Sequence, residues 1–267
     1  MKFINVSKSV WICQDSQYYL VNSVCVNLGS ELLFVDTGIN SRVAQKFRKK
    51  MHEVFDQKKA ILTFTHANND HFMGLEAFLD IPIIATDKFM EPYTNRIKSS
   101  KQPRLKGFKP TETYSSSKTF GSEENSLTFT LTGGHTEDSC FGYFPAEKIL
   151  IAGDNLLSDY PQFLIHPDSN LEKIIECLKK WVKIEIETVI PGHGNITTPS
   201  HLKRVLAYFE SLYEFLIQGR KSNLQFNEII THPNLPEYFE PDPNNWIGRG
   251  IKQVYKKINE NKEKANS

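Results

Sequence analysis

The stretch AILTFTHANNDHFMG, residues 60–74, decides how the rest of the chain can be interpreted. Its first five residues form an apolar run of the kind that makes a buried strand. A polar loop follows, and it carries four candidate metal-binding side chains within six positions: His66, Asn68, Asp70 and His71. No other part of the sequence gathers so many such groups. The stretch therefore predicts a strand that delivers a metal-binding loop.

Three more candidate ligands follow at long range. They are His135 in GGHTEDS, Asp154 in AGD and His193 in PGHG, and each lies in a glycine-containing turn at or beyond the end of a strand-like run. Strands hold the stems of such loops rigidly, which suits an active site. Imidazole and carboxylate groups together favour zinc, iron or manganese. The remaining histidines have no motif around them and are interpreted as surface or structural residues: His52, His166, His201 and His232.

The hydrophobic periodicity alternates between the two kinds of secondary structure. Strand-like patterns cover residues 10–35, 60–64, 82–86, 111–154 and 187–190. Helix-like spacing covers residues 39–56, 72–79, 87–97, 170–182, 201–217, 223–231 and 245–258. Asn40 or Ser41 can cap the first of these helices and Asp87 the third. We therefore expect an α/β domain in residues 1–200 and a helical C-terminal extension, residues 201–267, packed on it.

Composition narrows the class of protein. A chain of 267 residues with 39% hydrophobic content can bury a substantial core. Its formal net charge of +1 provides no overall field for nucleic acid or a membrane surface. There is no apolar run of about 18 residues, and the N-terminus lacks the pattern of a secretory signal. The four cysteines are scattered without a CxxC pair, as expected for reduced thiols. These features predict a cytoplasmic protein with no membrane partner.

One segment departs from this charge balance. Residues 96–109 contain six cations and no acid: Arg96, Lys98, Lys101, Arg104, Lys106 and Lys109. The segment can be a solvated connection, or it can be a docking surface for an anionic substrate. Tyr160 and Phe163, which follow the AGD turn, are candidates for the wall of a substrate site.

The order of the motifs resembles the metallo-β-lactamase superfamily of metallohydrolases. That family carries HxHxDH, then GHT, GD and PGHG turns, and the corresponding stretches here are HANNDH, GGHT, AGD and PGHG. The upstream VDTG, residues 35–38, matches a further element of the family. The resemblance covers about the first 200 residues. It implies a four-layer αββα sandwich with the metal site at one edge.

The resemblance also implies a division of ligands between two metal sites. The first would use His66, position 68 and His135, and the second would use Asp70, His71 and His193, with Asp154 bridging both. Position 68 departs from the family because it is Asn rather than His. An amide oxygen is a weaker donor for zinc than imidazole, so we expect the second site to fill first. A binuclear centre with Asn68 as an oxygen ligand, or with water in its place, is the alternative.

The activity implied by the resemblance is hydrolysis of an ester, thioester, lactone or phosphodiester bond by a metal-activated hydroxide. Asp70 and Asp154 would orient water and transfer protons, while Thr65 and Asp36 would hold the histidines. We expect one or two Zn²⁺ ions, with iron or manganese as alternatives, and a small anionic substrate rather than nucleic acid. The helical C-terminal part resembles the glyoxalase II-like and endoribonuclease-like branches. The other candidates are an iron-dependent redox enzyme, like flavodiiron proteins or persulfide dioxygenases, and a non-catalytic member with a weakened site.

Overall fold

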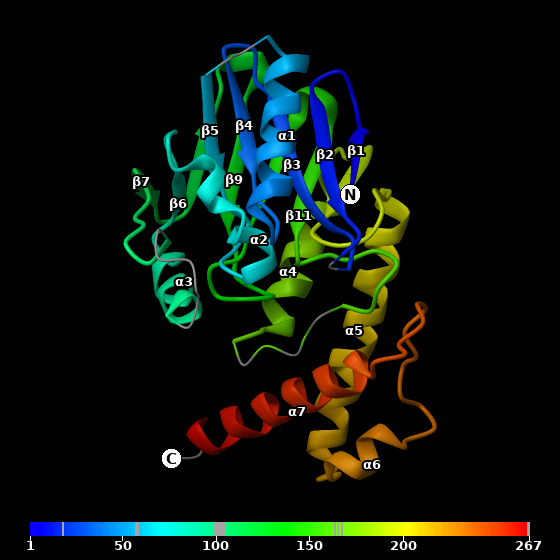
Figure 1. Ribbon diagram of the computed structural model, residues 1–267. Helices are drawn as coiled ribbons and strands as arrows, with labels where there is room; N and C mark the ends of the chain where they lie inside the picture. The colour runs from blue at the N-terminus through cyan, green and yellow to red at the C-terminus, as the bar shows by residue number, and fades with distance from the viewer. Residues whose placement is uncertain are drawn as a thin grey trace.

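Two five-stranded sheets lie face to face at the centre of the molecule in the computed structural model (Figure 1). The structure describes residues 1–17, 19–56, 59–98, 105–162, 164, 166 and 168–265, without the side chains of residues 123 and 261–265. The first sheet has the order β1 (Lys2–Asn5), β2 (Val10–Asp15), β3 (Val21–Asn27), β4 (Glu31–Val35), β5 (Lys59–Thr63). The second has the order β12 (Thr188–Pro191), β11 (Ile149–Gly153), β10 (Cys140–Phe144), β9 (Leu127–Leu131), β8 (Ser117–Phe120). A third, two-stranded sheet pairs β6 (Ile84–Thr86) with β7 (Glu112–Tyr114).

Each large sheet ends in a parallel strand–helix–strand unit. In the first sheet, α1 (Ser41–Val54) connects β4 to β5, and the side chain of Asn40 caps the helix. In the second, α4 (Leu171–Trp181) connects β11 to β12 and is capped by Asn170. Parallel strands place their carboxyl ends at the same edge of a sheet. The ends of β5, β11 and β12 therefore meet at one edge of the sandwich, the lower edge in Figure 1.

The hydrophobic core has three layers. Between the sheets, inward-facing residues of both meet, among them Val24, Leu33, Phe129 and Ile151. The outer face of the first sheet is covered by α1 and the segment after it, with Phe47 packed against Phe34. The outer face of the second sheet is covered by α4 and the C-terminal helices. This arrangement confirms the predicted αββα sandwich with a helical extension.

The C-terminal helices are α5 (Pro199–Lys221), α6 (Phe226–Ile230) and α7 (Trp246–Ala265). Helix α5 packs along α4, and α7 crosses α5 below the sandwich (Figure 1). Trp181 of α4, Phe209 of α5 and Val254 of α7 belong to one buried cluster with residues of β11 and β12. The expected boundary at residue 200 falls in the first turn of α5. The division into residues 1–200 and 201–267 stays a prediction.

Several expected elements have different bounds in the structure. The helix expected over residues 72–79 is replaced by α2 (Asn69–Phe72) and a 3₁₀ turn (Leu75–Phe78), so Asp70 and His71 lie inside a helix rather than before one. Asp87 does not cap α3 (Met90–Ile97), which begins after Phe89. Two further 3₁₀ turns cover Glu123–Asn125 and Pro145–Glu147. All four cysteines are free and buried, as expected. Among the described residues, no helix is long and apolar enough to cross a membrane.

Candidate metal centre

The predicted ligands from both sheets come together at the shared edge. They form two compact groups, in each of which one ligand atom per residue lies within 4.8 Å of the others. The first group contains His66, His135 and Asp154, and the second contains Asp70, His71 and His193. Five of the six residues are buried, and Asp70 is partly buried. The grouping matches the division that the motif order implied, apart from Asn68, which lies beside the first group.

The carboxylate of Asp154 lies between the two groups. Its Oδ2 atom is 3.7 Å from Nε2 of His66 and 3.6 Å from Nε2 of His135. Nε2 of His71 is 3.3 Å from Oδ1, and Nε2 of His193 is 3.5 Å from Oδ2. Gly192 leaves room for this carboxylate, because a Cβ atom at that position would lie 1.8 Å from Oδ1. Asp154 is therefore in reach of both groups.

The chemistry of these residues fits a divalent metal in each group. Nε2 of His66, Nε2 of His71 and Oδ1 of Asp154 are buried, and no hydrogen-bond partner for them is found in the described part of the chain. Buried polar atoms normally have such partners. Imidazole nitrogen and carboxylate oxygen are the donors that zinc takes in proteins. A cation placed within each group would satisfy these atoms.

The charges of the site differ between the two groups. Burial lowers the pKa of His66 well below its usual value, and the neighbouring His71 adds to this effect. For His71 the effect of burial is outweighed by the carboxylates of Asp154 and Asp36, which raise its pKa well above the usual value. His193 is also buried, but Asp154 and Asp70 raise its pKa to about 9. In the metal-free site, protons on the second group thus hold positive charge where a metal would bind.

Asp36 orients histidines of both groups through contacts on the side of each ring away from Nε2. Its Oδ2 atom accepts hydrogen bonds from Nδ1 of His71 (2.9 Å) and from Oγ1 of Thr65 (2.7 Å), and Oδ1 accepts from the Thr65 amide (2.8 Å). Oγ1 of Thr65 in turn lies 3.0 Å from Nδ1 of His66. Occupying Nδ1 in this way leaves Nε2 directed at the site. The contacts agree with the role expected for Thr65 and Asp36.

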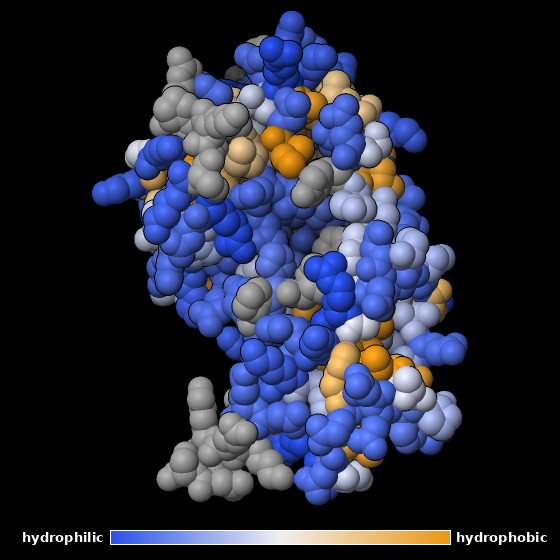
Figure 2. Space-filling model, turned by 60° about the horizontal axis from the view of Figure 1, so that its bottom comes forward, coloured by the Kyte–Doolittle hydropathy of each residue, from blue (hydrophilic) through white to orange (hydrophobic). Residues whose placement is uncertain are grey.

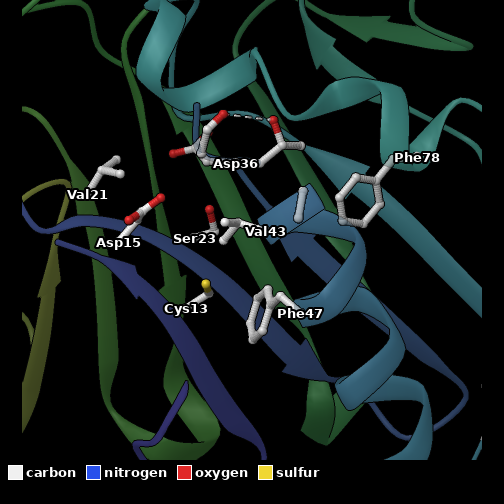
Figure 3. A pocket seen from close by; sticks show the side chains of 11 residues that line it. Cys13, Asp15, Val21, Ser23, Asp36, Val43, Phe47 and Phe78 are labelled. Carbon is white, nitrogen blue, oxygen red and sulfur yellow. Dashed lines mark hydrogen bonds between the residues drawn. The ribbon is translucent and has the colours of Figure 1, made fainter. Parts of the chain in front are cut away.

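A small pocket lies behind this carboxylate. Figure 3 shows Asp36 beside Asp15 and Ser23, with Phe47 and Phe78 on the side of α1. None of the six grouped ligands lines this pocket, so it is separate from the space into which the ligands project.

Other residues hold the ligand loops through backbone contacts, and sequence reasoning did not identify them. Asn155 accepts a hydrogen bond from the backbone amide of His135 (2.7 Å), and Ser169 donates one to its carbonyl (2.8 Å). Asp138 accepts from the amide of Ala67 (2.7 Å). Nδ1 of His193 donates to the carbonyl of Tyr19 (2.9 Å). The only sequence signals were the positions of Asn155 directly after AGD and of Asp138 two residues after GHT.

Asn68 lies between two histidines. Its Nδ2 atom is 3.0 Å from Nε2 of His135 and 3.2 Å from Nε2 of His166, while its Oδ1 atom is buried with no hydrogen-bond partner among the described residues. His166, interpreted from the sequence as a surface or structural residue, thus lies beside the first group. His201, by contrast, is a structural residue whose Nε2 donates to the carbonyl of Leu157 (2.7 Å).

The residues expected around a substrate are described only in part. The ring of Tyr160 lies 5.9 Å from that of Tyr19, which in turn lies 5.0 Å from that of Trp246. Phe163, Lys101 and Arg104 lie outside the described residues. Arg96 is half-buried, and its charge adds to burial in lowering the pKa of His166. The face of the molecule at the carboxyl ends of β5, β11 and β12 is mainly hydrophilic and has a hollow near its middle (Figure 2).

Solved structures share this fold. A metallo-beta-lactamase from Pontibacter korlensis is similar with a TM-score of 0.64 and 19% identity, over 78% of this chain and 98% of that one. A double mutant of the sec-alkyl sulfatase PisA1 is similar with a TM-score of 0.75 and 14% identity, over 96% of this chain and 50% of that one. At this level of identity the two structures are evidence for the fold alone.

Sequence comparison agrees with the fold. A Drosophila melanogaster protein described as a beta-lactamase-like protein 2 homolog is 20% identical over 253 residues, which is 90% of this chain and 82% of that protein. A family model described as the metallo-beta-lactamase superfamily matches residues 18–193, a range that contains every residue of the two ligand groups. The chain therefore belongs to the metallo-beta-lactamase superfamily.

Proposed function

We propose that this protein hydrolyses an ester, thioester, lactone or phosphodiester bond with a metal-activated hydroxide, and that the metal is zinc. Membership of the superfamily supports a metal-dependent hydrolase in general terms, and the bond and the metal are the proposal. The observation that carries it is the position of Asp154. Its carboxylate lies within 3.3–3.7 Å of four histidine nitrogens that belong to two ligand groups.

His66 and His135 would hold the first metal, and Asp70, His71 and His193 the second, with Asp154 shared by both. When bound, such metals activate water near neutral pH and polarise the carbonyl or phosphoryl oxygen of a substrate. Asp154 and Asp70 accept protons and orient water, because their carboxylates face the same space as the histidines. Asp36 keeps His71 oriented throughout, since its contact is on the far side of the ring.

The second group is the more complete of the two. It has two imidazoles, the carboxylate of Asp70 and a share of Asp154, whereas the first group lacks the histidine expected at position 68. We therefore propose that the second group binds its metal first and more tightly. The amide nitrogen of Asn68 faces His135, so this side chain would have to turn its oxygen toward the group to act as a ligand.

The substrate proposed is a small anionic molecule. Arg96 supports this choice, because its charge acts on His166 and on Asp138, two groups that border the ligand loops. Tyr19 and Tyr160 would supply the apolar wall. The net charge of +1 offers no general attraction to nucleic acid, which is therefore not favoured as the substrate.

The test combines metal analysis with an activity panel. Protein purified without added metal is assayed for zinc, iron and manganese, and then for hydrolysis of a thioester, a lactone and a phosphodiester. We expect zinc at one to two ions per chain and activity on one substrate class that chelation abolishes. Asp154→Ala should lose that activity, whereas Asp87→Ala, the same change at an exposed acid outside both ligand groups, should keep it.

Two other results would replace the proposal. Iron together with oxygen consumption would favour a redox enzyme on this fold. Metal content near zero, even after incubation with zinc, would favour a non-catalytic protein.

A further inference from the structure

We propose that His166 completes the first metal group, as a third imidazole ligand that takes the place of the histidine missing at position 68. This inference rests on the metal-dependent function proposed above. It adds a ligand from a different part of the chain, the segment between β11 and α4, rather than from the loop that follows β5.

The first argument is the direction of two imidazole nitrogens. Nε2 of His135 and Nε2 of His166 both face the Nδ2 atom of Asn68, at 3.0 and 3.2 Å. An amide NH₂ group donates and cannot accept, so each nitrogen directs its lone pair at that group. Two lone pairs that converge on one partly positive group also suit a cation, which imidazole binds at about 2.0–2.1 Å when it is zinc.

The second argument is the arrangement of the rings. The His135 and His166 rings are 4.9 Å apart with an interplanar angle of 82°. The His66 and His135 rings are 5.0 Å apart at the same angle. The ring of His166 therefore has nearly the same distance and angle to the ring of His135 as the ring of His66, a member of that group, has.

The third argument is the short turn that holds both rings. Ser169 donates its amide hydrogen to the carbonyl of His166 (3.0 Å) and its hydroxyl hydrogen to the carbonyl of His135 (2.8 Å). Ser169 is buried. Ser169 thus holds the backbone of both histidines, one through its amide and the other through its side chain, which keeps His166 close to the first group.

The amide of Asn68 must leave its position for the metal to bind. His166 lies outside the compact group of His66, His135 and Asp154, on the other side of that amide. Oδ1 of Asn68 is buried without a partner in the described part of the chain, and burial of an unpartnered oxygen is unfavourable. Rotation of the side chain out from between the rings therefore breaks only its two bonds to imidazole. Three imidazoles and Asp154 would then give the four donors of a tetrahedral site.

The experiment is a cobalt(II) titration of the full chain, followed by removal of loosely bound ion and by metal analysis. We expect two ions per chain for the wild type and about one for His166→Ala, with first-site affinity lowered on the order of 100-fold or more, since even an outer contact is worth 10–100-fold. Asn68→Ala should keep two ions. Asn68→His combined with His166→Ala should restore two, because the new imidazole replaces the lost one.

The matched control is His232→Gln, which changes a histidine outside both groups that accepts a hydrogen bond from the backbone amide of Asn234. It should leave the count at two. If His166→Ala also keeps two ions with the wild-type visible spectrum, the inference is wrong. If Asn68→Ala loses an ion whereas His166→Ala keeps both, the ligand is the amide and not His166.

A second measurement needs no variant. Each imidazole bound to cobalt(II) gives one strongly shifted N–H proton signal that disappears in heavy water. Five such signals are expected with His166 bound and four without it. A wild type that binds no metal would instead overturn the proposed function, so the two failures are distinguishable.

Discussion

Replacing Asp36 with Asn would test whether a residue that touches no metal controls the affinity of the site. Asp36 has a backbone φ of +58°, a left-handed conformation that Asn tolerates and Ala does not favour. The Asn side chain also has nearly the same shape. The substitution therefore isolates the loss of one charged acceptor from any change of backbone or volume.

The expected size of the effect follows from the three hydrogen bonds that Asp36 accepts. An Asn amide carries an NH₂ group in place of one carboxylate oxygen, and this group must face either Thr65 or Nδ1 of His71. Because NH₂ cannot accept a hydrogen bond, one of the bonds that Asp36 accepts is lost in either case. A hydrogen bond to a charged group contributes about 1.5–3 kcal/mol. Since about 1.4 kcal/mol is a factor of ten, metal affinity should fall about 10–100-fold.

Competition with a chromophoric chelator would measure this change for both sites. The matched control is Asp15→Asn, the same chemical change at a buried carboxylate that lines the same pocket and accepts its hydrogen bond from Gln17 (Figure 3). Asp15→Asn should stay within about threefold of the wild type, below the range expected for a lost orienting contact. Wild-type affinity in Asp36→Asn, or an equal loss in Asp15→Asn, would show that the carboxylate does not orient His71.

Three further predictions concern room, charge and packing. Gly192→Ala should abolish binding of both metals, because its Cβ would lie 1.8 Å from Oδ1 of Asp154. The control Gly107→Ala, whose Cβ meets nothing within 4 Å, should bind both metals, and metal analysis of the two variants measures the difference. The metal-free protein should lose stability above neutral pH. The folded pKa of His193 is about 9, above its unfolded value of about 6.5, so its contribution to the free energy of unfolding is complete below pH 6.5 and is lost as pH rises through 9. Denaturant unfolding at pH 6, 8 and 10 measures this change. His193→Gln should reduce it. Phe209→Ala should cost about 3–5 kcal/mol in one unfolding transition, since Phe209 is fully buried in a cluster that joins α5 to the second sheet; two separate transitions would contradict this.

The fold could be predicted because the order of the motifs resembles that of the superfamily. The residues of both groups could be chosen as candidates because each lies at or beyond a strand end or in a glycine-containing turn. The parallel pairs β4–β5 and β11–β12 then fix which edge of the sandwich those ends share. The start of α2 was misplaced for a local reason. Asn68, Asn69 and Asp70 are all typical of loops and equally typical of a helix N-terminus, and only the backbone shows that the helix begins at Asn69.

His166 could not be found from the sequence. It lies in a segment with no periodicity and no motif, 98 residues from Asn68, and its nearness to the site depends on the turn that Ser169 holds. Asp138 and Asn155 were missed for a similar reason: they bond to the backbone amides of Ala67 and His135, and no pattern of residue types records such contacts.

The division of the ligands between the two halves of the molecule has a thermodynamic consequence. The first group joins His66, after β5, to His135 and Asp154 of the second half, and the second group joins Asp70 and His71 of α2 to His193, after β12. A metal in either group therefore links the two sheets at the edge where they meet. A ligand that binds only the folded state, at a free concentration 100 times its dissociation constant, adds about 2.7 kcal/mol to the free energy of unfolding. Because neither half alone supplies a complete group, this stabilisation should be lost when the sheets separate, even if each half kept its secondary structure.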